Sequence, residues 1–275
     1  MRFVFLCFLS SIYLCLCPLI AEERAHPPTF TDQFGIDFIL VTSGKYATPV
    51  EKDAGLEEDS IEVDQPFYLS RTEITQDQWE KLMGSHTWQN SAEYQEHGGY
   101  GEGANFPVYF VSFTDAQSFI GRLNEKMNKP TYRLPTEMEW EYAARAGSST
   151  PYSFGADPEA LDRFGWFEGN ADDTQEVGKK QPNAWGFFDM HGNVWEWVLD
   201  DNEDPYILNP KSDEPPERNK RGGSWRKAAV NCQVTSVGVQ DDNTREDDIG
   251  FRLVRIIELP KSQIDTKTDK RSETE

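Results

Sequence analysis

Three stretches of the chain concentrate β-branched and aromatic residues between polar segments, and we expect them to form β-strands. The first covers residues 37–50 (DFILVTSGKYATPV) and the second covers residues 66–75 (PFYLSRTEIT). Residues 51–64, which separate them, are mostly acidic and indicate a solvated loop. Residues 249–259 (IGFRLVRIIEL) predict a last strand near the C-terminus.

Three predicted helices share one capping pattern, in which a threonine is followed three residues later by glutamine or glutamate. The pairs are Thr75 with Gln78, Thr114 with Gln117, and Thr136 with Glu139. The middle helix carries apolar residues at helical spacing, namely Ala116, Phe119, Ile120, Leu123 and Met127. Gly84 and Gly147 lie where the first and third helices should end.

From residue 148 to 221 the regular periodicity disappears, and Gly, Asn, Asp and Pro become frequent. Such a composition alone would indicate loops or disorder. The segment and its flank nevertheless hold many large aromatic residues, including Trp166, Trp185, Trp195, Trp197 and Trp225. Because disordered segments lack this apolar area, we predict a compact, loop-rich domain held by aromatic packing.

The N-terminus has the features of a secretory signal. Residues 1–21 contain one early positive charge, an apolar run from Phe3 to Ile20, and Ala21 before the polar residues 22–24. We therefore predict a signal peptide over 1–21 and export to the periplasm or the extracellular space, with no membrane span after cleavage. A retained anchor is the alternative, because the run is near the minimum length of a span. We expect a linker over 22–35 and a disordered charged tail over 258–275.

The charge balance limits the partners. The chain has 48 Asp and Glu against 27 Lys and Arg, for a net charge of −21. Nucleic-acid binding requires basic surface, so we expect no nucleic-acid partner. Signal cleavage would remove Cys7, Cys15 and Cys17 and leave Cys232 as the one mature cysteine, which excludes an intramolecular disulfide.

The motif GNVWEW combines residue types that suit a hard cation. Gly192 allows a tight backbone, Asn193 offers an amide oxygen, and Glu196 offers a carboxylate. Ca²⁺ binds such mixtures of carboxylate, amide and main-chain oxygens. The alternative is a loop held by hydrogen bonds alone.

Four motifs occur in the order found in the formylglycine-generating enzyme family, also called the sulfatase-modifying-factor domain. They are YRLPTEMEWEYAARAG (132–147), GFFDMHGNVWEWVLD (186–200), RGGSW (221–225) and GFRLV (250–254). The chain resembles this family over residues 36–257. The resemblance implies a single α+β domain of the formylglycine-generating-enzyme fold, related to C-type lectins and low in regular secondary structure.

The resemblance also implies structural calcium at the GNVWEW motif. Asn193, Glu196 and the main chain at Val194 match the family pattern, and Glu73 is a further candidate ligand. A second family calcium site lies upstream, where Asn170 and Asp172 occur here, but we assign no ligands there.

The histidines bear on a different metal, because some relatives hold non-haem iron on a histidine cluster in an added helical domain. Here His26, His86, His97 and His191 show neither the ligand spacing nor that extra domain, so we expect no iron site.

The oxygen-dependent enzymes of the family hold copper(I) on two cysteines after the GGS motif. They oxidise a peptide cysteine of a nascent sulfatase to formylglycine. The family pattern places these cysteines three and eight residues after the serine. Counted from Ser224, the first position is Lys227 and the second is Cys232. Because one thiolate cannot form the two-cysteine site, we expect copper to be absent.

Two functions from different classes remain open. The first is a formylglycine-generating-type oxidoreductase, or a related periplasmic one, that acts through Cys232 and Ser224. The second is a noncatalytic exported module that binds a peptide, protein or glycan on its lectin-like loop face. In the second case Cys232 would be a small buried side chain.

Overall fold

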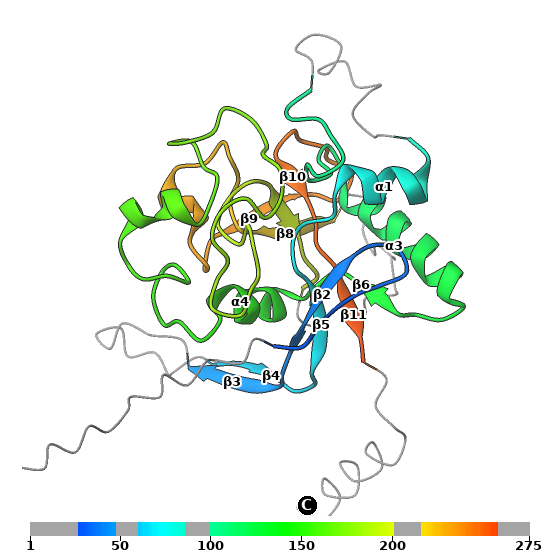
Figure 1. The fold of residues 1–275 in the computed structure, drawn as a ribbon, viewed down its shortest axis with the longest axis horizontal. Helices are drawn as coiled ribbons and strands as arrows, with labels where there is room; N and C mark the ends of the chain where they lie inside the picture. The colour runs from blue at the N-terminus through cyan, green and yellow to red at the C-terminus, as the bar shows by residue number, and fades with distance from the viewer. Residues whose placement is uncertain (1–26, 48–59, 86–98, 201–215, 258–275) are drawn as a thin grey trace, which may run out of the picture.

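The computed structural model describes residues 27–47, 60–85, 99–200 and 216–257. The predicted signal peptide (1–21) and tail (258–275) lie outside these residues. The described residues form an α+β domain with two sheets, a hairpin and long irregular loops (Figure 1). The α+β class and the loop-rich character that the family resemblance implied are thus confirmed. Within them, no helix is both long enough and apolar enough to cross a membrane.

The first sheet has five strands in the order β1-β2-β5-β11-β6, and all neighbouring strands are antiparallel. Its members are β1 (Thr29–Thr31), β2 (Asp37–Val41), β5 (Phe67–Ser70), β6 (Tyr132–Arg133) and β11 (Val254–Ile256). Strand β11 lies between β5 and β6, so the first and last strands of the described residues share this sheet. A hairpin of β3 (Gly44–Ala47) and β4 (Ser60–Val63) lies beside it.

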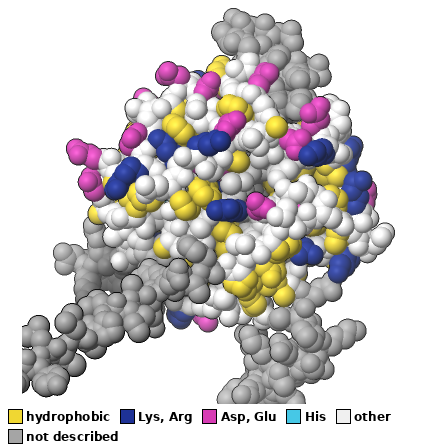
Figure 2. All heavy atoms as spheres, viewed as in Figure 1, with side chains coloured by type: hydrophobic (Ala, Val, Ile, Leu, Met, Phe, Trp, Pro, Cys, Tyr) yellow, Lys and Arg dark blue, Asp and Glu magenta, His cyan; other side chains and the backbone are white. Residues whose placement is uncertain are grey.

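The second sheet has four strands in the order β10-β7-β8-β9. Its members are β7 (Trp195–Trp197), β8 (Glu217–Arg221), β9 (Val237–Asp241) and β10 (Ile249–Gly250). Strand β10 is parallel to β7, whereas the other pairs are antiparallel. Figure 1 shows β8, β9 and β10 in the upper half of the molecule and the five-stranded sheet below. In the same view, Figure 2 shows acidic and basic side chains interspersed with apolar ones over this face.

Two predicted helix caps are confirmed and one is wrong. Thr75 caps α1 (Gln76–Met83) and Thr136 caps α4 (Glu137–Arg145), each with a complete capping box. The middle helix, α3 (Phe113–Met127), is capped by Ser112 with Asp115 instead of by Thr114 with Gln117. Thr114 lies inside the first turn, and its hydroxyl donates to the Asn243 side chain at 3.2 Å.

The helix ends and the linker also differ in detail. Gly84 ends α1 in the left-handed conformation, as expected. At the end of α4, Ala146 itself adopts that conformation (φ 47°) one residue before Gly147. Strand β1 lies inside the segment predicted to be a linker and pairs with β2, so part of residues 22–35 belongs to the domain.

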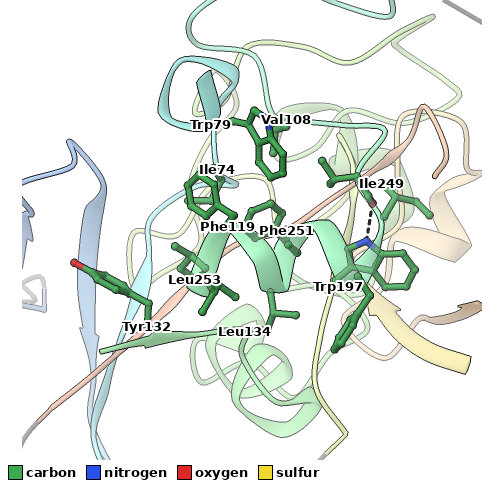
Figure 3. Packing of buried hydrophobic residues seen from close by; sticks show 14 of the residues in the cluster. Ile74, Trp79, Val108, Phe119, Tyr132, Leu134, Trp197, Ile249, Phe251 and Leu253 are labelled. Atoms are coloured by element: carbon green, nitrogen blue, oxygen red, sulfur yellow. Dashed lines mark hydrogen bonds between the residues drawn. The ribbon is translucent and has the colours of Figure 1, made fainter. Parts of the chain in front are cut away.

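Aromatic side chains from distant segments form the core. Trp79 of α1 stacks on Phe119 of α3 at 5.3 Å between ring centroids, and Phe251 packs edge-on against both rings. Figure 3 shows these rings together, with the Trp197 indole donating to the Val111 carbonyl at 2.9 Å. The predicted aromatic packing therefore holds the irregular chain, although it joins the helices as well as the loops.

Short helical turns interrupt the loops at η2 (Pro158–Arg163) and η3 (Ala229–Cys232). A smaller cluster joins them, in which Tyr152, Leu161 and Cys232 are fully buried. Through this cluster the segment around residue 150 supports the loop that follows β8.

Candidate functional site

The GGS loop after β8 adopts a backbone conformation that glycine allows. Gly222 and Gly223 have φ angles of 98° and 76°, in the left-handed region. A Cβ atom on Gly223 would lie 2.6 Å from both the Asn231 carbonyl oxygen and the Cys232 sulfur. The loop therefore approaches η3 closely, and Cys232 lies directly against it.

Cys232 is a buried free thiol with no exposed surface. Its sulfur lies 3.9 Å from the Ser224 carbonyl oxygen, which accepts a weak hydrogen bond from the thiol. Burial raises the pKa of Cys232 to about 12, and the positive charge of Lys227 offsets this only in part. The thiol is thus protonated and shielded at neutral pH.

Ser224 and Lys227, the other two residues of the family's thiol region, also have hydrogen-bond partners within the domain. The Ser224 hydroxyl donates to Oδ2 of Asp248 at 2.6 Å and accepts from the main-chain N–H of Arg226 at 3.3 Å. Lys227 is half-buried, and its main chain joins Ser224 and Glu168, with N–O distances of 3.1 Å on each side. The lysine therefore fills the position of the missing cysteine without a sulfur ligand.

Asp248 is a buried carboxylate next to Ser224. It could act as a general base only if the Ser224 hydroxyl were free to act as a nucleophile. Burial raises the pKa of Asp248, while the hydrogen bond from Ser224 lowers it. The one described histidine, His191, forms its hydrogen bonds with other residues than this pair. Its Nδ1 lies 2.8 Å from the Cys232 carbonyl oxygen and its Nε2 lies 2.8 Å from the Ser153 hydroxyl. Burial lowers the pKa of His191 to about 4, so the ring is neutral.

Next to Ser224 the loop presents a partly exposed arginine that lies over a buried tryptophan. Trp225 stacks on Tyr100 at 5.7 Å, and the Arg226 guanidinium lies 5.1 Å from the Trp225 ring centre. Arg226 donates to both oxygens of Asp247 at 2.6 and 2.7 Å, and its side chain is 48% exposed. We call Tyr100, Trp225 and Arg226 the loop platform. Its guanidinium is fixed, partly exposed and available to a ligand.

The predicted calcium ligands Glu73 and Asn193 meet in the interior. Asn193 Nδ2 donates to Glu73 Oε1 at 3.1 Å, and Asn193 Oδ1 accepts from the main-chain N–H of Gln175 at 2.9 Å. Glu73 Oε2 is buried without a hydrogen-bond partner, and so is Oδ1 of Asp189. Val194 is buried beside Asn193.

Burial raises the pKa of both carboxyl groups, and the negative charge of Glu196 adds to both shifts, whereas a hydrogen bond with the Glu73 side chain lowers the pKa of Asp189. The pKa of Glu73 is raised well above its usual value, first by burial and then by the negative charges of Asp189 and Glu196. Burial raises the pKa of Asp189 to about 6. Two unpartnered oxygens in an electronegative interior suit a hard cation. However, within the described ranges, no three His, Cys, Asp or Glu side chains converge as a metal centre.

Glu196 departs from the expected ligand role. Arg252 donates to both of its oxygens at 2.6 and 2.7 Å, and the Trp140 indole adds a third bond at 2.6 Å. Neither Glu196 nor Arg252 has exposed surface. This geometry assigns Glu196 to a buried salt bridge instead of to calcium, because its oxygens are already satisfied.

Asn170, in the upstream segment, holds a loop instead of facing an open site. Its Oδ1 accepts from Phe167 at 2.9 Å, and its Nδ2 donates to Asp162 at 2.9 Å and to Gly165 at 3.1 Å. His26, His86 and His97 lie outside the described residues. For these residues the question of an iron site stays a prediction.

The profile of the family described as "Sulfatase-modifying factor enzyme 1-like domain" matches residues 23–257. The chain belongs to this family. The match begins before residue 36 and so includes β1, consistent with the pairing of β1 in the main sheet. It supports the formylglycine-generating-enzyme fold that the four motifs indicated.

Individual relatives agree with the family assignment. The chain is 26% identical over 264 residues to "Chaperone protein LppX" of Paenibacillus barcinonensis, covering 80% of this chain and 89% of the relative. It is 29% identical over 184 residues to the formylglycine-generating enzyme of Mycobacterium tuberculosis, covering 55% of this chain and 58% of that enzyme. Among solved structures, Treponema denticola variable protein 1 superposes with a TM-score of 0.66 at 25% identity, covering 83% and 98% of the two chains.

Three residues of this family member's site were not found from sequence. They are Asp248, which holds Ser224, and Asp189 and Arg252, which surround Glu73 and Glu196. Asp189 carries one usable signal, a position three residues before Gly192 within a recognised motif. Arg252 lies in the motif GFRLV, but nothing local indicates that its partner is 56 residues away.

Proposed function

We propose that this member of the sulfatase-modifying-factor family is a noncatalytic, exported module that binds protein or peptide ligands. The state of the thiol carries the proposal: Cys232 is fully buried and its pKa is raised to about 12, while Lys227 takes the position of the first of the two family cysteines. Thiolate is the form that binds copper(I) and reacts with oxidants. A shielded, protonated thiol supplies neither chemistry.

The loop platform supports a binding role. Arg226 is half-exposed and held in place by Asp247 and the buried Trp225 ring, and arginine is enriched at interface hot spots. The name of the LppX relative, a chaperone protein, points in the same direction. We therefore favour a protein or peptide ligand over a glycan.

An oxidoreductase working through Cys232 and Ser224 would require an accessible thiolate. The Ser224 hydroxyl is committed to Asp248, and Cys232 contacts the interior through Tyr152 and Leu161. A binding role requires neither the exposure of Cys232 nor the release of Ser224 from Asp248.

Copper binding and peptide oxidation test this proposal together. Residues 22–275, which retain Cys232 alone among the cysteines, should not retain Cu(I) against a thiol-competitive chelator. They should also leave a Cys-x-Pro-x-Arg peptide unoxidised under oxygen. Tight copper binding that is lost in Cys232→Ala, or formylglycine in the peptide product, would overturn the noncatalytic role.

The same proposal includes export by residues 1–21. Its support is the charge and apolar pattern of that segment. N-terminal sequencing of the protein from a secreting host should give a terminus near Glu22. A retained Met1 in a membrane fraction would favour the anchor instead.

We further propose that calcium binds at Glu73, Asn193 and the main chain of Val194, without Glu196. The support is the unpartnered Glu73 Oε2, the nearby unpartnered Asp189 Oδ1, and the excess negative charge around them. Bound Ca²⁺ would neutralise this charge and stabilise the folded state.

The melting temperature with calcium and with chelator tests the calcium proposal. Calcium should raise it, and Glu73→Gln should remove the response because the amide loses the charge at similar size. Glu168→Gln, at an exposed loop position, is the matched control and should keep the response. An equal melting temperature with and without chelator would refute the site.

A further inference from the structure

Strand β9 (Val237–Asp241) is an edge strand of the four-stranded sheet. It pairs with β8 on one side, and the sheet order places no described strand on its other side. The pairing is antiparallel and runs from Glu217 opposite Asp241 to Arg221 opposite Val237. Figure 1 shows β9 next to β8, away from the five-stranded sheet.

The hydrogen-bond pattern shows which groups face outward. The Asp242 N–H donates to the Pro216 carbonyl at 3.0 Å, so these two residues form a hydrogen-bonded pair of the β8–β9 ladder. Hydrogen-bonded and non-hydrogen-bonded pairs alternate along antiparallel strands. The N–H and C=O groups of Gly238 and Gln240 therefore point to β8. Those of Val237 and Val239 point to the opposite side, where the sheet has no described neighbour.

A second contact supports this assignment. Asn219, which lies opposite Val239, uses its carbonyl to accept from the Val198 N–H at 3.1 Å. The N–H and C=O groups of Asn219 therefore point to β7, so Asn219 forms no main-chain hydrogen bond with Val239. The outer edge of β9 thus offers two donors and two acceptors in strand geometry.

The same strand carries exposed apolar side chains. Val237 and Val239 are 46% and 51% exposed, and Val230 of η3 is 62% exposed. These three are the exposed large hydrophobic side chains of the described ranges. Ser236 bonds to the Val230 carbonyl at 3.3 Å and connects η3 to the start of β9. An edge that no strand of the described residues covers, and that carries β-branched side chains, is a template for strand addition.

The charges around β9 indicate what kind of segment fits. Glu217 and Asp241 are exposed and lie directly opposite each other in a non-hydrogen-bonded pair, where side chains are closest. Like charges in this arrangement destabilise the sheet. No ion pair within the described residues neutralises either one, and Asp242 adds a third acid next to them. A lysine or arginine of a bound segment would relieve the repulsion.

We propose that the outer edge of β9 binds an extended, positively charged segment of a partner protein by strand addition. The segment places β-branched residues beside Val237 and Val239 and a basic residue beside Asp241. The inference rests on the proposed binding function and names the chemistry of its ligand. A second copy of the chain is disfavoured, because it would bring its own acidic residues and a net charge of −21 to the same edge.

Fluorescence anisotropy with a defined peptide tests the proposal. The probe is labelled Lys-Thr-Val-Thr-Val-Thr-Val-Thr-Lys, which presents the same pattern in parallel and antiparallel orientation. It should bind the protein, and its glutamate-ended counterpart should bind at least about tenfold more weakly because of the acidic edge. Asp241→Asn should weaken binding of the basic probe several-fold and reduce its salt dependence.

The decisive variant is Val239→Pro. It removes the outward N–H without removing a bond to β8, and proline is tolerated at such edge positions. Binding of the basic probe should fall about tenfold or more. The control Val239→Thr keeps the N–H and the β-branched shape, and should lose less than about threefold. Circular dichroism confirms that both variants keep the wild-type fold.

Three results would overturn the proposal. They are no binding of the basic probe at millimolar concentration, equal binding by wild type and Val239→Pro, and equal binding of the two probes. Sedimentation velocity adds a fourth, because a dimer abolished by Val239→Pro would assign the edge to a second copy. None of these outcomes affects copper binding or peptide oxidation, so a failure here is distinct from a failure of the noncatalytic role.

Discussion

The thiol of Cys232 should be among the least reactive that a folded protein can carry. Its pKa is raised from 9.0 to about 12 by burial. At pH 8 a thiol with that pKa is ionised in roughly one molecule in ten thousand, about a thousandfold less than an unperturbed thiol. Full burial adds a steric barrier, so alkylation must await local or global opening of the domain.

Alkylation of residues 22–275 by iodoacetamide, followed by intact mass, measures this directly. At pH 8 the alkylation rate of the native protein should be at least about a thousandfold below the rate in urea, because the thiol is both protonated and buried. The native rate should also rise continuously up to pH 10. A cysteine placed at Val230, 62% exposed in the same short helix, in a Cys232→Ala background, is the matched control and should react at the rate of a free thiol.

Two results would refute the reasoning. One is a native rate within tenfold of the rate in urea. The other is a rate that reaches a plateau near pH 8, which would place the thiol pKa below that pH. Either would restore Cys232 as a candidate nucleophile.

Three further predictions concern stability. Arg252→Met should cost about 3–5 kcal/mol in urea unfolding, because it leaves Glu196 buried and unpaired. Adding Glu196→Gln should recover part of this loss, and a cost below about 1 kcal/mol for the single change would exclude the salt-bridge role. His191 has a pKa lowered from 6.5 to about 4, so the unfolded chain binds more protons than the folded domain in this range. The contribution of His191 to stability should therefore fall by up to about 3 kcal/mol as the pH drops from 6.5 to 4, and it is measured as the difference in pH dependence between the wild type and His191→Gln. Ser112→Ala should lower stability by about 1 kcal/mol through loss of the α3 cap, whereas Thr114→Ala should stay within about 0.5 kcal/mol, and the reverse order would favour the original cap assignment.

The helix-cap results show where local sequence patterns reach their limit. Ser112 with Asp115 and Thr114 with Gln117 are both plausible capping boxes, two residues apart. Local chemistry does not choose between them. The choice depends on where the chain leaves the core, and Thr114 is drawn instead to Asn243, 129 residues away in sequence.

The site was predictable as a set of motifs but not as a set of contacts. The sequence indicated that Cys232 lacks a second thiol and could be a buried side chain, and the structure buries it completely. It also proposed Glu196 as a calcium ligand, because a carboxylate beside an asparagine looks like a donor set. Its true partner, Arg252, belongs to a different motif, and only the fold brings the two side chains within 2.6 Å.

The position of residues 249–256 has a consequence for the order of folding. Strand β10 pairs with β7 in one sheet, and β11 pairs with both β5 and β6 in the other. A ribosome-bound chain that has not yet released this segment has β5 and β6 without their common neighbour and Glu196 without Arg252. Native packing must therefore wait until residues 249–256 have left the ribosome. Until then the chain remains accessible to chaperones and other proteins that bind unfolded polypeptides.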